Sequence, residues 1–275
     1  MQQQSSALAF GGTQSVWTHA STSTGTDMTF AVFTPPGEGP FPVLWYLSGL
    51  TCSHQNVMDK GEYRRAAAEL GLMIVCPDTS PRGEGVRAHE DDWQLGCGAG
   101  FYVDATEPGY EHFQMHAYLT AELPALVAEH FPADMARQGV FGHSMGGHGA
   151  LTLALKHPQQ FKSCSAFAPI VQPSTADWSR KALAAYLGDN PEAWRAYDAT
   201  LLIADGHRIE QLLVDQGEAD SFLNDGLRPW LLESACADAD IDLTLRMQPG
   251  YDHSYFFIST FMDDHLRWHA ERLTA

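Results

Sequence analysis

The sequence lacks a surplus of basic residues and has few cysteines. Its 16 Lys and Arg residues stand against 34 Asp and Glu residues, so the formal net charge is −18. Such a charge disfavours nonspecific binding to nucleic acids and to anionic membranes. The cysteines are odd in number, far apart and without a C-x-x-C pair: Cys52, Cys76, Cys97, Cys164 and Cys236. We therefore expect reduced thiols, no nucleic-acid partner and no membrane partner.

Long apolar runs, internal repeats and low-complexity stretches are also missing. Residues 1–20 contain no Lys or Arg and no apolar core, so we expect neither a secretory signal nor an anchor, and a cytoplasmic location. No composition shift marks a linker, and α/β proteins of 275 residues commonly form one domain. The expectation is a single domain over residues 1–275.

What the sequence does contain is a series of short apolar runs that alternate with helical patterns. Strands are expected at residues 43–47, 72–76, 140–141, 163–167, 212–214 and 243–247, after an antiparallel pair at 15–20 and 28–34. Helices are expected at 61–70, 115–130, 146–157, 227–237 and 255–273. This order predicts an α/β fold with a mostly parallel sheet and helices on both faces. The long segment 77–108 predicts a pocket-forming loop.

The most informative motif is the G-x-S-x-G sequence at residues 142–146. It lies between an expected strand and a helix of small residues, as in a nucleophile elbow, where a strained turn exposes a serine. We predict that Ser144 is the nucleophile and that the backbone N–H of Met145 faces an oxyanion. A glycine-rich turn with a solvated serine is the competing interpretation. His143 and His148 lie too close to Ser144 to act as its base, and we expect them to line the pocket.

A serine nucleophile needs a base, and the base needs an orienting acid. His253 lies between an expected strand and the helix at 255–273, and α/β-hydrolases follow the order Ser, acid, His. Asp215 and Asp220 both qualify as the acid. Asp215 ends an apolar run and could tie down the following turn, whereas Asp220 lies farther into the loop, where it could fix the histidine tautomer. The pattern favours Asp220 and leaves Asp215 open.

Several sequence blocks closely resemble S-formylglutathione hydrolases, also called the esterase D family. They span nearly the whole chain in the family's order: residues 47–52, 98–106, 141–151, 165–170, 197–200, 215–217 and 250–255. The resemblance implies an α/β-hydrolase fold, hydrolysis of the thioester S-formylglutathione, no cofactor and usually a homodimer. It assigns Ser144 as nucleophile, Asp220 as acid and His253 as base. It also implies that the Leu50 backbone N–H is the second oxyanion donor, beside Met145.

Further residues are expected at the pocket. Cys52 follows Leu50 by two positions and could make activity sensitive to thiol reagents, or could be a buried apolar thiol. Trp93 is either pocket wall or core. The family commonly has an acidic residue and an aromatic after the Asp92–Trp93 pair, whereas this chain has Gln94 and Leu95, so the pocket edge is expected to differ.

Three other functions are compatible with parts of the pattern. A general short-chain carboxylesterase would use the same three residues. A noncatalytic binding protein on the same fold would usually lack the nucleophile, which is present here. A metal enzyme could use the histidine pairs spaced by four residues, His112 with His116 and His265 with His269, but no third-ligand pattern accompanies them, so we expect no metal.

Overall fold

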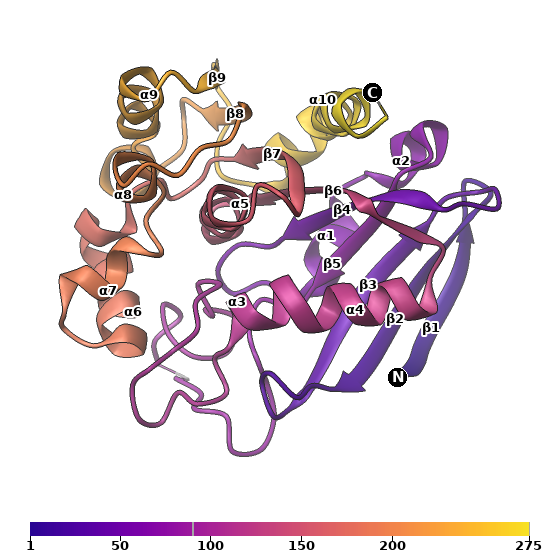
Figure 1. Cartoon of the computed structure of the whole chain (residues 1–275), viewed down its shortest axis with the longest axis horizontal. Coiled ribbons are helices and arrows are strands. Elements are labelled where there is room, and N and C mark those ends of the chain that lie inside the picture. Colours follow the sequence, from indigo (N-terminus) through magenta and orange to yellow (C-terminus); the bar gives the residue numbers. More distant parts are fainter. Residues whose placement is uncertain (90, 275) are drawn as a thin grey trace.

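The computed structural model describes residues 1–89 and 91–274. Within them, nine strands form one sheet in the order β1-β2-β3-β5-β4-β6-β7-β8-β9 (Figure 1). The strands are β1 (Gln2–Ala9), β2 (Gly12–Ala20), β3 (Asp27–Thr34), β4 (Phe41–Leu47), β5 (Met73–Pro77), β6 (Ala133–His143), β7 (Phe161–Phe167), β8 (Gln211–Gly217) and β9 (Asp242–Gln248). β1, β2, β3 and β5 pair antiparallel in that order, and all pairings from β5 to β9 are parallel. The predicted mostly parallel α/β sheet is confirmed.

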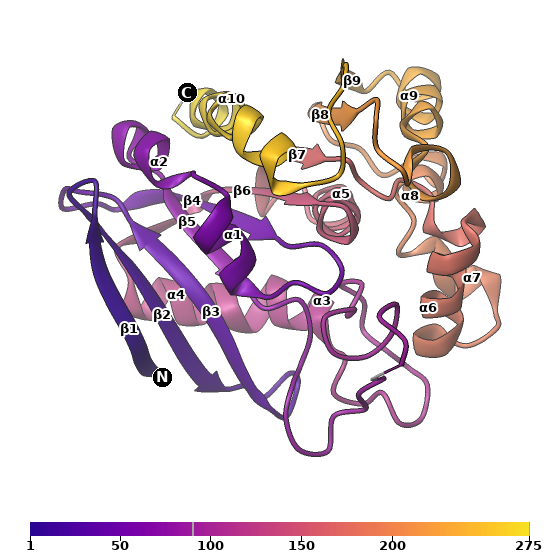
Figure 2. The same cartoon turned by 180° about the vertical axis from the view of Figure 1, so that it is seen from behind.

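Helices cover both faces of the sheet. Figures 1 and 2 show α1, α2 and α10 on one face and α4 and α5 on the other, with α8 packed against α5. The helices are α1 (His54–Lys60), α2 (Arg64–Leu70), α3 (Met115–Ala117), α4 (Leu123–His130), α5 (Met145–Lys156), α6 (Asp177–Leu187), α7 (Pro191–Arg195), α8 (Ala199–Ala204), α9 (Pro229–Asp238) and α10 (Tyr255–Leu273). Each described helix falls short of the length and apolar character that a membrane crossing requires.

Burial explains which strands the apolar pattern reveals. Every residue of β4 and β5 is buried, because helices cover both faces of these central strands. β1 lies at the edge of the sheet, is rich in Gln and Ser, and exposes seven of its eight residues. It has no apolar alternation, so the sequence did not predict it. The expected strand at 140–141 is the buried end of β6, which begins at Ala133.

The helix predictions were partly wrong in extent. α10 has the expected bounds, whereas the expected helix at 61–70 is limited to α2, and α1 precedes it. Ser53 caps α1 through a capping box with Asn56, a polar signal that the apolar pattern does not contain. The expected helix at 115–130 is α3 and α4 joined by a π-helical turn, Tyr118–Glu122. α6, α7 and α8 were not predicted.

The long segment between β5 and α3 packs against α6. The Tyr186 hydroxyl on α6 accepts from the Gly96 N–H at 2.9 Å and donates to the Ala99 carbonyl at 2.8 Å. The Tyr186 carbonyl also accepts from the Thr106 N–H at 2.8 Å. These contacts hold the segment beside α6, close to the ends of the parallel strands (Figure 1).

Candidate active site

Ser144 sits at the turn between β6 and α5 in a strained conformation, with φ 58° and ψ −117°. The neighbouring glycines allow the turn to pack closely. A Cβ on Gly142 would lie 2.4 Å from the Gly146 carbonyl oxygen, and a Cβ on Gly146 would lie 1.9 Å from the Leu47 carbonyl oxygen. Any side chain at either glycine would collide with backbone. The local structure is therefore the strand–turn–helix that the G-x-S-x-G motif predicts.

Six of the predicted site residues line one cleft of about 310 Å³: Leu50, Cys52, Trp93, His143, Ser144 and His253. The other two lie directly behind this surface. Asp220 binds His253, and Met145 follows Ser144 as the first residue of α5. The structure thus brings together residues from five separate parts of the chain.

The imidazole of His253 is oriented by Asp220. His253 Nδ1–H donates to Asp220 Oδ2 at 2.5 Å, and the carboxylate is fully buried. The Phe222 N–H donates to Asp220 Oδ1 at 2.8 Å, and Gln216 Nε2 donates to Oδ2 at 3.2 Å. With its proton on Nδ1, the ring has a free basic Nε2. Among the described residues no hydrogen bond joins Ser144 Oγ to His253, and such bonds commonly tighten only when substrate binds.

Asp215, the second acid candidate, is bound elsewhere. Its carboxylate accepts hydrogen bonds from Arg246, Gln248 and His265. Burial alone would raise the pKa of Asp215, but the bonds from these groups lower it to about 2. The structure therefore separates the two aspartates: Asp220 contacts His253, and Asp215 ties strands and a helix together.

The loop that carries Leu50 packs directly on the serine. A Cβ on Gly49 would lie 3.2 Å from Ser144 Cβ. The Leu50 N–H lies in this loop, and the Met145 N–H is one of the first amides of α5, which have no acceptor within the helix. The two predicted oxyanion donors therefore belong to two different segments that meet at Ser144.

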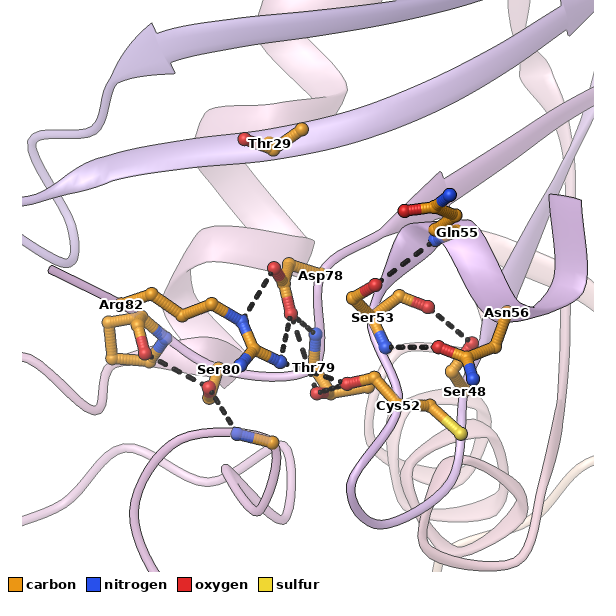
Figure 3. A network of polar contacts seen from close by, with 12 residues as sticks. Thr29, Ser48, Cys52, Ser53, Gln55, Asn56, Asp78, Thr79, Ser80 and Arg82 are labelled. Atoms are coloured by element: carbon orange, nitrogen blue, oxygen red, sulfur yellow. Dashed lines mark hydrogen bonds and ion pairs between the residues drawn. The ribbon is translucent and has the colours of Figure 1, made fainter. Parts of the chain in front are cut away.

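A polar clamp formed by Asp78, Thr79 and Arg82 binds this loop at Cys52 (Figure 3). The Cys52 carbonyl accepts from Thr79 Oγ1 at 2.5 Å and from Arg82 Nη2 at 3.0 Å. Arg82 also donates through Nε to Asp78 Oδ2 at 2.9 Å and through Nη2 to Asp78 Oδ1 at 3.1 Å. The apolar pattern did not predict this clamp. Its available signal was an Asp and an Arg spaced by four residues directly after an apolar strand.

His143 lines the cleft but is largely buried, and both of its ring nitrogens lack a hydrogen-bond partner among the described residues. Its ring centroid lies 4.3 Å from that of His253. Burial, followed by the proximity of His253, holds the pKa of His143 well below its usual value, so the ring is neutral. His148 differs from its prediction: it does not line the cleft, and its Nε2 contacts the Phe101 carbonyl oxygen at 3.0 Å.

An aromatic wall closes one side of the cleft. The Trp178 ring lies 6.4 Å from both Trp93 and Phe222, and Phe222 lies 5.1 Å from His253. Trp178 fits because a Cβ on Gly226 would come within 2.4 Å of its ring. Trp93 is half exposed and is therefore wall and not core. Sequence reasoning missed Trp178 and Phe222, since single aromatics on unpredicted elements carry no pattern.

The histidine pairs considered as metal ligands have other partners. His265 and His269 bind serines of β7, His116 contacts His157, and His112 contacts the Thr24 carbonyl. Within residues 1–89 and 91–274, no group of three or more His, Cys, Asp or Glu side chains is arranged to hold a metal ion.

Comparisons with known proteins identify the family of this chain. The family model described as "Putative esterase" matches residues 21–268. The chain is 55% identical to an S-formylglutathione hydrolase of Paracoccus denitrificans over 96% of this chain and 95% of that protein. It is 50% identical to the Bos taurus S-formylglutathione hydrolase over 100% of this chain and 99% of that protein.

A solved structure of an S-formylglutathione hydrolase from Agrobacterium tumefaciens has 64% identity and a TM-score of 0.98, covering 99% of this chain and 100% of that one. The similarity is therefore high in sequence and in fold along the full length of both chains. This chain belongs to the S-formylglutathione hydrolase family of α/β-hydrolase esterases.

Proposed function

We propose that this protein hydrolyses S-formylglutathione to formate and glutathione through an acyl-serine intermediate. The observation that carries the proposal is the Asp220–His253 pair, which opens onto the same cleft as the Ser144 elbow. The names of the relatives supply the substrate class. Ser144 is the nucleophile, His253 the general base and Asp220 the acid that orients it.

In the first step Ser144 Oγ attacks the thioester carbonyl carbon while His253 Nε2 takes the hydroxyl proton. The Asp220 carboxylate stabilises the imidazolium that forms, and the N–H groups of Leu50 and Met145 donate to the oxyanion. The C–S bond then breaks. A thiol has a pKa of about 8.5, so the glutathione sulfur leaves with little need of proton donation in the transition state. The departing thiolate then takes the proton from the His253 imidazolium, which returns His253 to its neutral, basic form.

In the second step water attacks the formyl-serine ester. His253 takes a proton from that water, the ester C–O bond breaks, and the proton passes to Ser144 Oγ as formate is released. The proposed steps use only groups of this chain and water. His143, Cys52 and Trp93 form cleft walls in this proposal, with Trp178 and Phe222 beside them.

The test compares wild type with Ser144→Ala on S-formylglutathione, with p-nitrophenyl acetate as the simple-ester control. We expect fast thioester hydrolysis by wild type and a loss on the order of 10⁴-fold or more in the variant. Retention of activity in Ser144→Ala would contradict the nucleophile assignment.

The ratio of the two substrates decides between the proposed function and a general carboxylesterase. If wild type cleaves the acetate ester through Ser144 but shows no preference for the thioester, the mechanism stands and the glutathione assignment fails. No turnover of either substrate by a folded protein would favour a noncatalytic binding role.

A homodimer, which the family resemblance suggests, and a cytoplasmic location are further parts of the proposal. Light scattering coupled to size-exclusion chromatography tests the assembly: a mass of about twice 30.2 kDa supports a dimer, and a mass of one chain contradicts it.

A further inference from the structure

The buried carboxylate of Asp215 joins three elements. Arg246 on β9 donates to it through Nε at 2.8 Å and Nη2 at 2.5 Å, and Gln248 on the same strand donates at 2.9 Å. His265 on α10 contacts Oδ2 through Nε2 at 2.9 Å. Asp215 itself lies on β8 and is fully buried. β8 leads into the loop that carries Asp220, here called the acid loop. β9 leads into the loop that carries His253, here called the histidine loop, and α10 follows that loop.

The contact with His265 continues as a buried chain into β7. His265 Nδ1 lies 2.8 Å from Ser165 Oγ, which lies 2.8 Å from His269 Nε2, and His269 Nδ1 lies 2.6 Å from Ser163 Oγ. A carboxylate only accepts hydrogen bonds, so His265 must donate through Nε2 and accept from Ser165 through Nδ1. Ser165 Oγ–H therefore donates to His265, His269 Nε2–H donates to Ser165, and Ser163 Oγ–H donates to His269, so every donor points toward Asp215. The charge of Asp215 therefore sets the tautomers of both histidines.

The backbone of Asp215 is also linked to the serine elbow. Its carbonyl oxygen accepts from the Ala168 N–H at 2.7 Å, just after β7. The carbonyl of Phe167, the residue before Ala168, accepts from the Ser144 N–H at 3.0 Å. The Phe167 ring stacks on His265 with centroids 3.8 Å apart. The end of β7 thus connects Asp215 to the nucleophile through two hydrogen bonds and one stacked pair.

The acid loop and the histidine loop are bound to each other. The Glu218 N–H donates to the Gln248 carbonyl at 3.0 Å, and the Ala219 N–H donates to the Tyr251 carbonyl at 2.9 Å. Gln248 uses its side chain on Asp215 and its backbone on the acid loop. A shift of β9 relative to β8 would therefore move His253 relative to its acid.

We infer that Asp215 is a positioning residue that fixes Ser144, Asp220 and His253 relative to one another. This inference rests on the proposed function, because it concerns the geometry of that reaction. Asp215 touches neither the cleft nor His253, so its effect is exerted through β7, β9 and α10.

The critical variant is Asp215→Asn, which keeps the shape and removes the charge. Arg246 and His265 both donate to the Asp215 carboxylate. An amide has one acceptor oxygen and one NH₂ group, so its NH₂ group must face at least one of these donors, and that hydrogen bond is lost. The matched control is Asp198→Asn. Asp198 is equally buried and accepts from the Thr200, Leu201 and Ser174 amides, but it holds α8 and has no contact with the three reacting residues.

Two readouts separate positioning from simple loss of stability. In Asp215→Asn we expect kcat for p-nitrophenyl acetate to fall by roughly 30- to 100-fold with KM changed less than about 3-fold, as for a misplacement of about 1 Å. The low-field proton resonance of the His253–Asp220 hydrogen bond should shift or broaden. In Asp198→Asn we expect kcat within about 2-fold of wild type and the resonance unchanged.

Equal kcat in the two variants, together with an unchanged resonance in Asp215→Asn, would overturn the inference. If wild type itself shows no hydrolysis, the proposed function fails, and the resonance still decides whether Asp215 positions His253. If Asp215→Asn does not fold, Arg246→Gln replaces it, because Arg246 is partly exposed. There we expect a fall in kcat of about 3- to 10-fold with the same shift of the resonance, and no change in either would overturn the inference.

Discussion

At the scale of single residues, the backbone of Ser144 is held in a conformation that costs of order 1–3 kcal/mol. The close packing of Gly142 and Gly146 against neighbouring carbonyl groups over-determines that conformation. The serine can therefore keep its strained geometry without substrate. Because the two glycines have no side chains, the neighbouring backbone can pack closely around the elbow and hold it in place.

Gly146→Ala tests this packing. The new Cβ would lie 1.9 Å from the Leu47 carbonyl oxygen, so β4 and α5 would have to move apart. We expect a loss of about 2–4 kcal/mol in the free energy of unfolding and loss of esterase activity. The control is Gly71→Ala, where φ is +66° but nothing lies within 4 Å, with an expected cost of about 1–2 kcal/mol and unchanged kcat. Urea unfolding and ester hydrolysis measure both; equal effects would contradict the clash.

Cys52 allows a prediction about thiol reagents. It lines the cleft, and burial raises the pKa of its thiol above the ordinary value. We expect inactivation by N-ethylmaleimide to be slow at neutral pH. As long as the pH stays below that pKa, the inactivation rate should rise about tenfold for each unit by which the pH rises. Cys52→Ser should resist the reagent, whereas Cys97→Ser, which changes another half-buried cysteine, should remain sensitive. Inactivation of Cys52→Ser at the wild-type rate would place the reactive thiol elsewhere.

At the scale of elements, the clamp between Asp78 and Arg82 connects the end of β5 to the Leu50 loop. We expect Arg82→Ala to lower kcat by roughly tenfold, with a smaller change in KM, because the loop that carries an oxyanion donor loses its support. Arg137→Ala is a closely matched control. Arg137 also pairs with an aspartate and a carbonyl, those of Asp134 and Pro40, and is similarly exposed.

Steady-state kinetics with p-nitrophenyl acetate measure both arginine variants. If Arg137→Ala lowers kcat as much as Arg82→Ala does, the effect reflects general stability and not the loop.

The ion pairs of Asp215 make stability depend on pH. Burial would raise the pKa of its carboxyl group, but hydrogen bonds from His265, Arg246 and Gln248 lower it from 3.8 to about 2. The folded state therefore holds this proton less tightly than the unfolded state. Its contribution of about 2 kcal/mol is complete above about pH 4 and is lost as the pH falls toward 2. Urea unfolding at about pH 5 and pH 3 should show a smaller loss in Asp215→Asn than in wild type; an equal loss would contradict this.

The sequence predicted the elements whose buried residues form a recognisable apolar pattern. The central strands were predicted from their apolar runs and α10 from the helical spacing of its apolar residues. The turn at Ser144 was predicted for a different reason, because the steric limits that require glycine appear directly in the motif. β1 and α1 were missed because an exposed edge strand and a capped helix depend on polar residues.

The site shows the same division. His253 follows from its place between a strand and a helix, whereas the choice between Asp215 and Asp220 depends on which carboxylate reaches the ring. Asp215 lies two residues before the end of β8 and Asp220 lies three residues after it, and the apolar pattern does not resolve that difference. Trp178 reaches the cleft only because the backbone at Gly226 passes close to it.

At the scale of the whole molecule, the net charge of −18 opposes the approach of an anionic thioester. Salt screens such repulsion, with a Debye length of about 10 Å at 0.1 M. We expect kcat/KM for S-formylglutathione to rise by about 2- to 5-fold between low and moderate ionic strength. The neutral p-nitrophenyl acetate should change little. A fall in kcat/KM for the thioester with added salt would show that positive charges near the cleft dominate the field instead.

Among the described residues β1 pairs with β2 alone, and four strands separate it from β6, which Ser144 directly follows (Figure 1). Its side chains are exposed and take almost no part in the core. A surface, a resin or a reporter protein attached along this strand would therefore face away from the cleft. Such a tethered preparation should keep the cleft accessible, which makes β1 a suitable point of attachment for a sensor of S-formylglutathione.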